Sequence, residues 1–353
     1  MLSDRQFDKI LQGMIPLPKA LRNGLLRCLF FGIKTPLDFQ KRYMRHLVYY
    51  VLRKTTTGWS YSFPAALDRK SNYTFMSNHR DIVLDSAFLC VFLLKAGFST
   101  TVEIAIGDNL LIYPWIKTLV RMNKAFTVNR GLTPKEMLKS SIHMSQYMHY
   151  VINDKHDNIW IAQREGRAKD SDDRTQESVL KMLNMGGPTP GKTTAEIIEN
   201  LRNMNIVPLA ISYEYDPCDY LKAKEFQCKR DIPGWKKAKQ DDLDNMKTGI
   251  WGKKGHVHYQ ASACINDWLD TLDPTAIDKA DIYRLVAEHI DHEIHANYKI
   301  YDVNRDALAG KENEYVESRV RMVDVEQPDV PFLREKIMTM YANPLRNHEK
   351  AVQ

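Results

Sequence analysis

Apolar residues along this chain change their spacing near residue 71. Between residues 19 and 54 they recur mostly every three or four positions, and Pro36 separates two such runs. This spacing predicts two amphipathic helices. From about Ser71 onward, short apolar runs alternate with helical patterns, which is typical of an α/β domain whose strands are covered by helices. The predicted strands are Tyr73–Met76, Val102–Ile106, Ala125–Val128, Asn158–Ala162 and Ile206–Ser212.

Helical spacing returns toward the C-terminus, in Asp281–Tyr298 and again in Val330–Tyr341. The clearest loop is Gly186–Lys192, which is rich in glycine and proline. We therefore expect a central α/β domain between a helical N-terminal region and a helical C-terminal tail. With 353 residues and 44% hydrophobic composition, the chain has enough apolar material for one large core or two modest ones.

Positive charge is concentrated in the predicted N-terminal helices. Residues 19–54 hold nine Lys or Arg residues and one acid, Asp38, a balance of +8, whereas the whole chain carries +6. Two interpretations stay open. The helices lie on an anionic membrane surface, where each Lys or Arg contributes about 1 kcal/mol, or they pack on the main domain and expose a solvated basic face. The interleaved Leu and Phe residues favour either interpretation over nucleic-acid binding.

Other sequence features bear on location. The longest apolar stretch, Ala87–Leu94, has eight residues, whereas a membrane-spanning helix needs about 20. The first residues lack the basic head and apolar run of a secretory signal. The five cysteines form no CxxC pair, so neither a disulfide framework nor a zinc knuckle is indicated. We expect a cytoplasmic protein that is peripheral on the inner face of the cell membrane.

One histidine, His79, occupies a position suited to catalysis. It ends a polar tripeptide between a predicted strand and a helix that begins near Asp81, and such junctions place functional side chains on a rigid scaffold. An imidazole beside a carboxylate can act as a general base, because the carboxylate fixes the tautomer of the ring. Asp81 resembles a helix N-cap, a role worth about 1 kcal/mol, so Asp85 is the favoured partner.

Three further segments follow His79 in a recognisable order. The first is Tyr113-Pro114-Trp115, followed by an apolar run that ends at Arg130. The second is residues 159–167, IWIAQREGR, and the third is an apolar strand that contains Val207-Pro208. Together with the segment around His79, they resemble the four motif blocks of the glycerolipid acyltransferases, the superfamily of glycerol-3-phosphate and 1-acylglycerol-3-phosphate acyltransferases.

The resemblance implies a fold, a reaction and a set of site residues. The implied fold is α/β with a mixed sheet flanked by helices, in which residues 61–300 form the acyltransferase domain, 1–60 the basic helical region and 301–353 the helical tail. The implied reaction moves a fatty acyl group from acyl-CoA or acyl carrier protein to a lysophosphatidate-like acceptor, with His79 as general base and Asp85 as orienting carboxylate. The thioester is a co-substrate, and no cofactor, metal or nucleic acid is expected. The implied substrate-binding residues are Asn78, Arg130, Glu165, Gly166 and Arg167.

The residue types at these positions suit the implied roles. The guanidinium of Arg130 offers a planar fork of donors for a phosphate or carboxylate, although a surface ion pair is the competing interpretation. Gly166 lets the backbone approach a ligand closely, and Glu165 can accept hydrogen bonds from acceptor hydroxyls. For these two residues the alternative is a solvated loop.

The chain also departs from the family pattern. Five residues separate His79 from Asp85, where the family usually has four, so the choice between Asp85 and Asp81 stays open. Residues 159–167 correspond to the third of the family's four blocks. There, Arg164 replaces the family's Pro, and Arg167 stands in the place of its Thr. The acceptor could therefore be glycerol-3-phosphate or a lyso-amino-acid lipid instead.

Two other motifs carry weaker alternatives. Residues 186–193, GGPTPGKT, match the phosphate-binding loop pattern, but the residues before them have helical spacing, and two prolines remove N–H donors from the loop. His289, His292 and Glu293 could hold a metal, but a polar helix face explains them better. A nucleotide-binding protein and a non-catalytic lipid-binding protein remain the alternatives to an enzyme.

Overall fold

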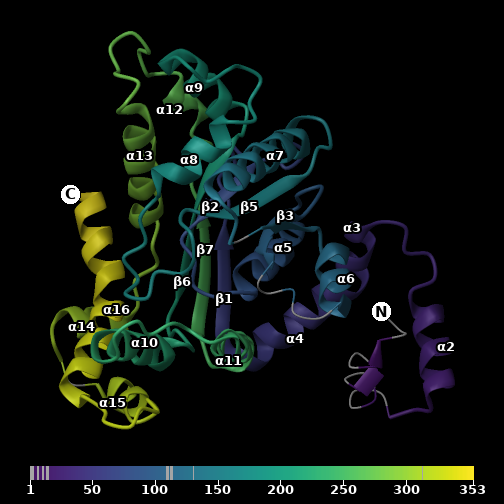
Figure 1. Ribbon diagram of the computed structural model, residues 1–353, viewed down its shortest axis with the longest axis vertical. Coiled ribbons are helices and arrows are strands. Elements are labelled where there is room, and N and C mark those ends of the chain that lie inside the picture. The colour runs from purple at the N-terminus through teal and green to yellow at the C-terminus, as the bar shows by residue number, and fades with distance from the viewer. Residues whose placement is uncertain are drawn as a thin grey trace.

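A mixed sheet forms the centre of the structure, a computed structural model that describes residues 4–5, 8–9, 12, 16–108, 111, 114–129, 131–311 and 313–353. Its strands are β1 (Thr56–Ser62), β2 (Thr74–Ser77), β3 (Val102–Gly107), β4 (Ala125–Val128), β5 (Asn158–Ala162), β6 (Ile206–Tyr213) and β7 (Gly255–Ala261). They lie side by side in the order β1-β7-β6-β2-β5-β3-β4 (Figure 1). Neighbouring strands are parallel except β6 and β7, which are antiparallel. The expected mixed α/β fold is confirmed.

Helices connect and cover these strands. The N-terminal helices are α2 (Lys19–Leu29), α3 (Pro36–Phe39), the π-helical turn η1 (Gln40–Met44) and α4 (Arg45–Thr55). Those of the central region are α5 (Leu84–Lys95), α6 (Pro114–Met122), α7 (Pro134–Asn153), α8 (Glu177–Asn184), α9 (Thr194–Arg202), α10 (Asp219–Asp231), α11 (Lys239–Trp251), α12 (Asn266–Leu269) and α13 (Ile282–Ala296). The last are α14 (Asp302–Leu308), α15 (Glu314–Val320) and α16 (Val330–Val352).

The sheet separates two apolar cores. Successive side chains of a strand point to opposite faces. Phe75 of β2 therefore lies in the core covered by α4 and α5, and Met76 lies in the core covered by α7, α8, α9 and α13. A third apolar cluster joins α10 to α14, α15 and α16. The C-terminal helices thus pack beside the sheet rather than on it (Figure 1).

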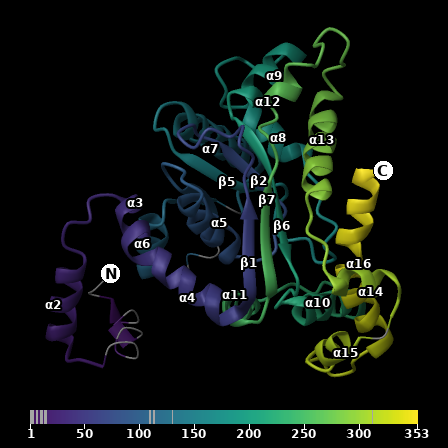
Figure 2. The same ribbon diagram turned by 180° about the vertical axis from the view of Figure 1, so that it is seen from behind.

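The N-terminal helices differ in how they contact the sheet. Helix α4 packs against α5 and β1, whereas α2 stands away from the sheet in both views (Figures 1 and 2). Five apolar side chains on or next to α2 are exposed, namely Leu17, Leu21, Leu25, Leu29 and Phe31. The helical spacing of this region is confirmed, and only its second half forms part of the main body. In the described part of the chain, no helix has the length and apolar character needed to cross a bilayer.

Strands β1 and β7 lie outside the strands predicted from the sequence. They pair in parallel with each other at one end of the sheet, with Trp59 opposite Val257 and Tyr61 opposite Tyr259. The predicted boundary at residue 60 falls inside β1. The division of the chain at residues 60 and 300 stays a prediction.

Candidate active site

His79 and Asp85 meet at the junction between β2 and α5. The strand ends at Ser77 and the helix begins at Leu84, and the intervening loop returns His79 to the first turn of the helix. Nδ1 of His79 lies 2.8 Å from Oδ2 of Asp85. Because a carboxylate accepts hydrogen bonds, Nδ1 carries the proton and Nε2 is left with its lone pair. Among the described residues, no protein group hydrogen-bonds to Nε2.

The Asp85 carboxylate is held by several donors besides His79. Oδ2 also accepts hydrogen bonds from the backbone N–H groups of Arg80 at 2.6 Å and Asp81 at 3.0 Å. Oδ1 accepts one from the hydroxyl of Tyr213 at 3.0 Å, and burial raises the pKa of Tyr213, so this hydroxyl stays protonated. The Asp85 side chain is fully buried, whereas that of His79 is 14% exposed. The carboxylate is therefore fixed in the interior and the imidazole faces outward.

Asp81 has a different role from Asp85. Its Oδ1 accepts hydrogen bonds from the backbone N–H groups of Val83 at 2.9 Å and Leu84 at 2.8 Å. These bonds cap the first turn of α5. Burial, with the charge of Asp85 nearby, raises the pKa of Asp81. The structure thus places Asp85, and not Asp81, in contact with His79.

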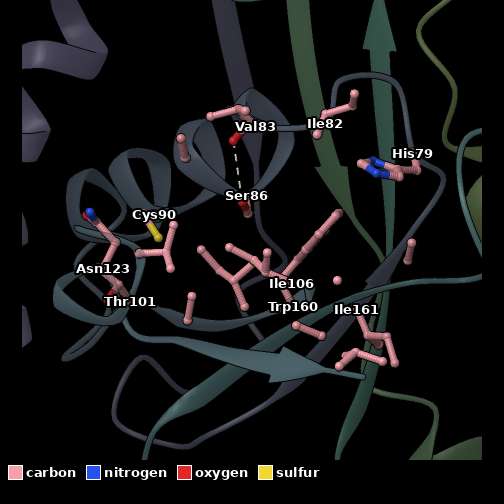
Figure 3. Close-up of a pocket in the computed structure, with 18 of the residues that line it drawn as sticks. His79, Ile82, Val83, Ser86, Cys90, Thr101, Ile106, Asn123, Trp160 and Ile161 are labelled. Carbon is pink, nitrogen blue, oxygen red and sulfur yellow. Dashed lines mark hydrogen bonds between the residues drawn. The ribbon is translucent and has the colours of Figure 1, made fainter. Parts of the chain in front are cut away.

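A cavity of about 640 Å³ opens beside His79 and runs along one face of α5 (Figure 3). Val83, Ser86, Cys90 and Leu94 line it at helical spacing. These positions span about 16 Å of helix at about 1.5 Å per residue. Most of the remaining lining is apolar, and part of it comes from β3, β5 and α6. The cavity therefore has the shape and chemistry of a site for an extended alkyl chain.

Polar side chains close the end of the cavity farthest from His79, where Figure 3 shows Thr101 and Asn123. The hydroxyl of Thr101 donates to Oε1 of Gln40 at 2.5 Å. Nε2 of Gln40 donates to the backbone oxygen of Asn123 at 3.2 Å. Gln40 begins the π-helical turn η1, a conformation that occurs often at functional sites. These groups satisfy one another, so they end the cavity without presenting unpaired donors to it.

Trp160 supports His79 from β5. Its indole Nε1–H donates to the hydroxyl of Ser77 at 2.9 Å, and its ring meets the ring of His79 edge-on at a centroid distance of 5.3 Å. Trp160 also lines the cavity. Trp160 received no role in the sequence analysis, although a large aromatic residue in the strand part of the segment 159–167 is a signal that points to one.

The predicted substrate-binding residues separate into two groups. Glu165 and Gly166 line the cavity next to His79, and Gly166 has φ +71°, a conformation that favours glycine. The amide of Asn78 instead exchanges two hydrogen bonds with the backbone of Ile211, at 2.9 and 2.8 Å. Asn78 is fully buried there and does not line the cavity described. Its position favours a structural link between the loop and β6.

Two arginines were also predicted to bind substrate. Nη2 of Arg167 donates to Oδ1 of Asn245 at 3.0 Å, and its charge acts on Asp216 and Asp81 behind the cavity. Arg167 is not among the described residues that line the cavity. Arg130 lies outside the described residues.

The two weaker motifs have structural explanations. The loop at residues 186–193 follows helix α8, not a strand, and Oε2 of Glu196 accepts hydrogen bonds from the N–H groups of Lys192 and Thr193. A carboxylate thus occupies the donors that a phosphate would need. His289 stacks on Trp268 at a ring distance of 3.8 Å. No group of three or more His, Cys, Asp or Glu side chains with metal-site geometry occurs among the residues described.

Comparison with protein-family models and with curated proteins found no match for this chain. Among solved structures, it is similar to the crystal structure of the 1-acyl-sn-glycerophosphate (LPA) acyltransferase, PlsC, from Thermotoga maritima. The match covers 77% of this chain and 88% of that chain, with 11% sequence identity and a TM-score of 0.39. Such a similarity assigns neither an activity nor site residues.

Proposed function

We propose that this chain is an acyltransferase that moves a fatty acyl group from acyl-CoA or acyl carrier protein to a hydroxyl group of a lysophosphatidate-like glycerolipid. One observation carries the proposal. The His79–Asp85 pair, joined at 2.8 Å, lies at one end of a long apolar cavity. A general base beside an alkyl-chain site suits a reaction between an acyl thioester and an alcohol.

In the proposed reaction, Nε2 of His79 takes the proton from the acceptor hydroxyl as its oxygen attacks the thioester carbonyl. Asp85 stabilises the imidazolium through Nδ1. The tetrahedral intermediate then expels the thiolate, which receives the proton from Nε2, and an ester and a free thiol result. General base catalysis of this kind accelerates a reaction by about 10²- to 10⁴-fold.

This mechanism needs no covalent acyl-enzyme. Cys90 is the thiol that lines the cavity, and burial raises its pKa to about 11. The thiol therefore stays protonated near neutral pH and is a poor nucleophile. A thioester is already activated, so direct transfer to the acceptor is sufficient.

The cavity suits the acyl chain of the donor. Its volume of about 640 Å³ falls in the usual range for ligand sites, about 300–1,000 Å³. Helix α6 has no buried residue, because Trp115, Ile116, Leu119 and Val120 face the cavity. A bound chain would give this apolar face a packing partner and remove it from water.

We also propose that the protein binds an anionic membrane surface through α2 and its neighbourhood. Leu21 on α2 and Phe31 just after it are 63% and 82% exposed and lie among Lys and Arg residues, and α2 stands away from the sheet. Exposed apolar residues and positive charge together favour an interfacial position. A lipid acceptor would then be reached at the membrane.

The test is release of free thiol from acyl-CoA, and from acyl carrier protein, by the purified protein. The acceptors are lysophosphatidate, glycerol-3-phosphate and a lyso-amino-acid lipid, and the variants are wild type and His79→Ala. Acceptor-dependent release that His79→Ala abolishes supports the proposal and identifies the acceptor. Release that persists in His79→Ala contradicts the mechanism. No release with any pair would favour the non-catalytic lipid-binding alternative.

A further inference from the structure

His79 and Arg164 leave neighbouring parallel strands at the same edge of the sheet. Strands β2 and β5 pair with Ser77 opposite Ala162, and the N–H of Gln163 donates to the oxygen of Ser77 at 2.8 Å. His79 and Arg164 each follow the paired residue by two positions. The carboxyl edge of parallel strands is where ligands bind in open α/β sheets. Both side chains line the same cavity.

Arg164 is the cation near this edge that both lines the cavity and is joined to no other described residue by a hydrogen bond or ion pair. Its Nε is buried and lacks a hydrogen-bond partner. Arg80 pairs with Asp173 at 3.6 Å, and Lys169 pairs with Glu225 at 3.0 Å. A buried donor that is left unpaired costs free energy, and this cost disappears when an acceptor arrives.

The charged residues that line the cavity are few, namely Arg45, Arg164 and Glu165 among those described. Arg45 belongs to α4, next to the N-terminal turn that holds Gln40 at the far end of the cavity. Glu165 is an anion and is exposed. Arg164 is therefore the cation at the His79 end, where the acceptor hydroxyl must bind for the proton transfer.

We propose that Arg164 binds the anionic group of the acceptor, a phosphate monoester or a carboxylate. This inference rests on the proposed acyltransferase function. A guanidinium presents paired donors that match either group. Arg164 thereby selects an anionic acceptor and holds its hydroxyl near Nε2 of His79. Arg167 also has a buried nitrogen without a hydrogen-bond partner, Nη1, but it does not compete for this role because it does not line the cavity.

The first experiment measures initial rates of acyl transfer at saturating donor for wild type, Arg164→Gln and Arg164→Lys. The acceptors are lysophosphatidate, a lyso-amino-acid lipid with a free carboxylate, and uncharged monoacylglycerol. Lys169→Gln is the matched control, because it removes one positive charge from the same loop outside the cavity.

Arg164→Gln should raise the KM of the anionic acceptor about 10- to 100-fold, the loss expected for hydrogen bonds to a charged group. The KM for monoacylglycerol and the kcat should stay close to those of wild type, and Arg164→Lys should be intermediate. Lys169→Gln should behave as wild type. Whichever anionic acceptor shows the effect identifies phosphate or carboxylate as the bound group. An unchanged KM in Arg164→Gln, or an equal rise for monoacylglycerol, would overturn the assignment.

A second experiment does not depend on turnover. Calorimetry should detect glycerol-3-phosphate, or an amino acid carboxylate, binding to His79→Ala and no binding to His79→Ala/Arg164→Gln. Binding that survives in the double variant, or no binding to His79→Ala, overturns the role of Arg164. If His79→Ala binds the anion and the wild type transfers no acyl group, the proposed reaction fails while the anion site stands.

Discussion

Tyr213 donates a hydrogen bond to Oδ1 of Asp85 at 3.0 Å, whereas the other carboxylate oxygen, Oδ2, accepts the hydrogen bond from His79. Tyr213→Phe should leave Oδ1 buried and unpaired. We expect a loss of about 1–3 kcal/mol in the free energy of unfolding, with a severalfold lower kcat because Asp85 is less firmly oriented. Denaturant unfolding and initial rates measure the two effects.

The matched control is Tyr298→Phe. The Tyr298 hydroxyl is also buried, but it has no hydrogen-bond partner among the described residues. Its removal should leave the unfolding free energy unchanged or slightly higher. Equal losses in the two variants would mean that the Tyr213 hydroxyl has no special effect on Asp85.

Asp85→Asn and Asp81→Asn are isosteric substitutions. Comparing them separates the orientation of His79 by Asp85 from the capping of α5 by Asp81. Asp85→Asn should lower kcat by about 10²- to 10⁴-fold, because an amide does not stabilise the imidazolium as a carboxylate does. Asp81→Asn keeps a side-chain oxygen for the N–H groups of Val83 and Leu84 and should retain most of the activity. Rates measured at saturating substrate give kcat for each variant. Similar losses of kcat in both variants would contradict the role of Asp85 as the residue that orients His79.

Cys90→Phe should shorten the cavity. Cys90 lies seven residues beyond Val83 along α5, about 10 Å at about 1.5 Å per residue, and both residues line the cavity. A phenyl group there should exclude long acyl chains and leave short ones able to bind. A series of acyl-CoA donors of increasing length tests this expectation. A uniform loss at every chain length would indicate damage to the fold instead.

Leu21→Glu and Phe31→Glu should weaken sedimentation with anionic vesicles, because each replaces an exposed apolar side chain by a negative charge. Binding of the wild type should also weaken with added salt, which screens surface charge. Met322→Glu is the control, since Met322 is 47% exposed and follows α15 by two residues, and α15 lies far from α2 in Figure 1. Vesicle binding that all three variants reduce alike would contradict a membrane surface at α2.

His295 should make folding stability depend on pH. Burial lowers its pKa from 6.5 to about 4, and the buried ring faces the backbone oxygen of Asp173 at 3.0 Å. Above pH 6.5 the ring is neutral in both states, so it has no effect. Between these two pKa values only the unfolded chain takes up the proton, so stability is lost as the pH falls, by at most about 3 kcal/mol.

Asp291 acts in the opposite direction over part of the same range. Burial raises its pKa from 3.8 to about 6, so the folded state gains a proton first and stability rises as the pH falls. The comparison of His295→Gln with wild type isolates the histidine. The unfolding free energy of His295→Gln minus that of wild type should rise as the pH falls from about 7 to about 4.5, because the contribution of Asp291 is common to both proteins. An unchanged difference would show that His295 titrates alike in both states.

The pairing of His79 with Asp85 could be predicted from the sequence because the two residues are close together in the chain. Asp85 is the sixth residue after His79, and the strand and helix around them have clear apolar patterns. The contacts of Trp160 and Tyr213 depend instead on the order β6-β2-β5 in the sheet. No local pattern encodes that order. The same is true of Arg167, whose contact with Asn245 depends on the position of α11.

The elements of the fold that the sequence analysis missed or shortened also depend on tertiary contacts. In β7 the buried positions alternate with His and Gln, and only Val257 and Tyr259 are large apolar residues. Such a short and weak alternation becomes a strand through its pairing with β1 and β6. Helix α16 was predicted to end at Tyr341, but it continues to Val352 with Pro344 inside it. Beyond the proline, Nδ1 of His348 lies 3.0 Å from the backbone oxygen of His295 in α13, a contact that ties this part of the helix to the main body.

The hydroxyl of Tyr259, in β7, donates to the backbone oxygen of Asp85 across 174 positions of sequence, and Tyr213 reaches its carboxylate across 128. A nascent chain that has emerged as far as α5 already contains both His79 and Asp85. It lacks Tyr213 and Tyr259, whose hydroxyl groups hold Asp85 in its orientation. The proposed activity therefore arises late in synthesis, when β7 joins the sheet, and an incomplete chain has both side chains without their orientation.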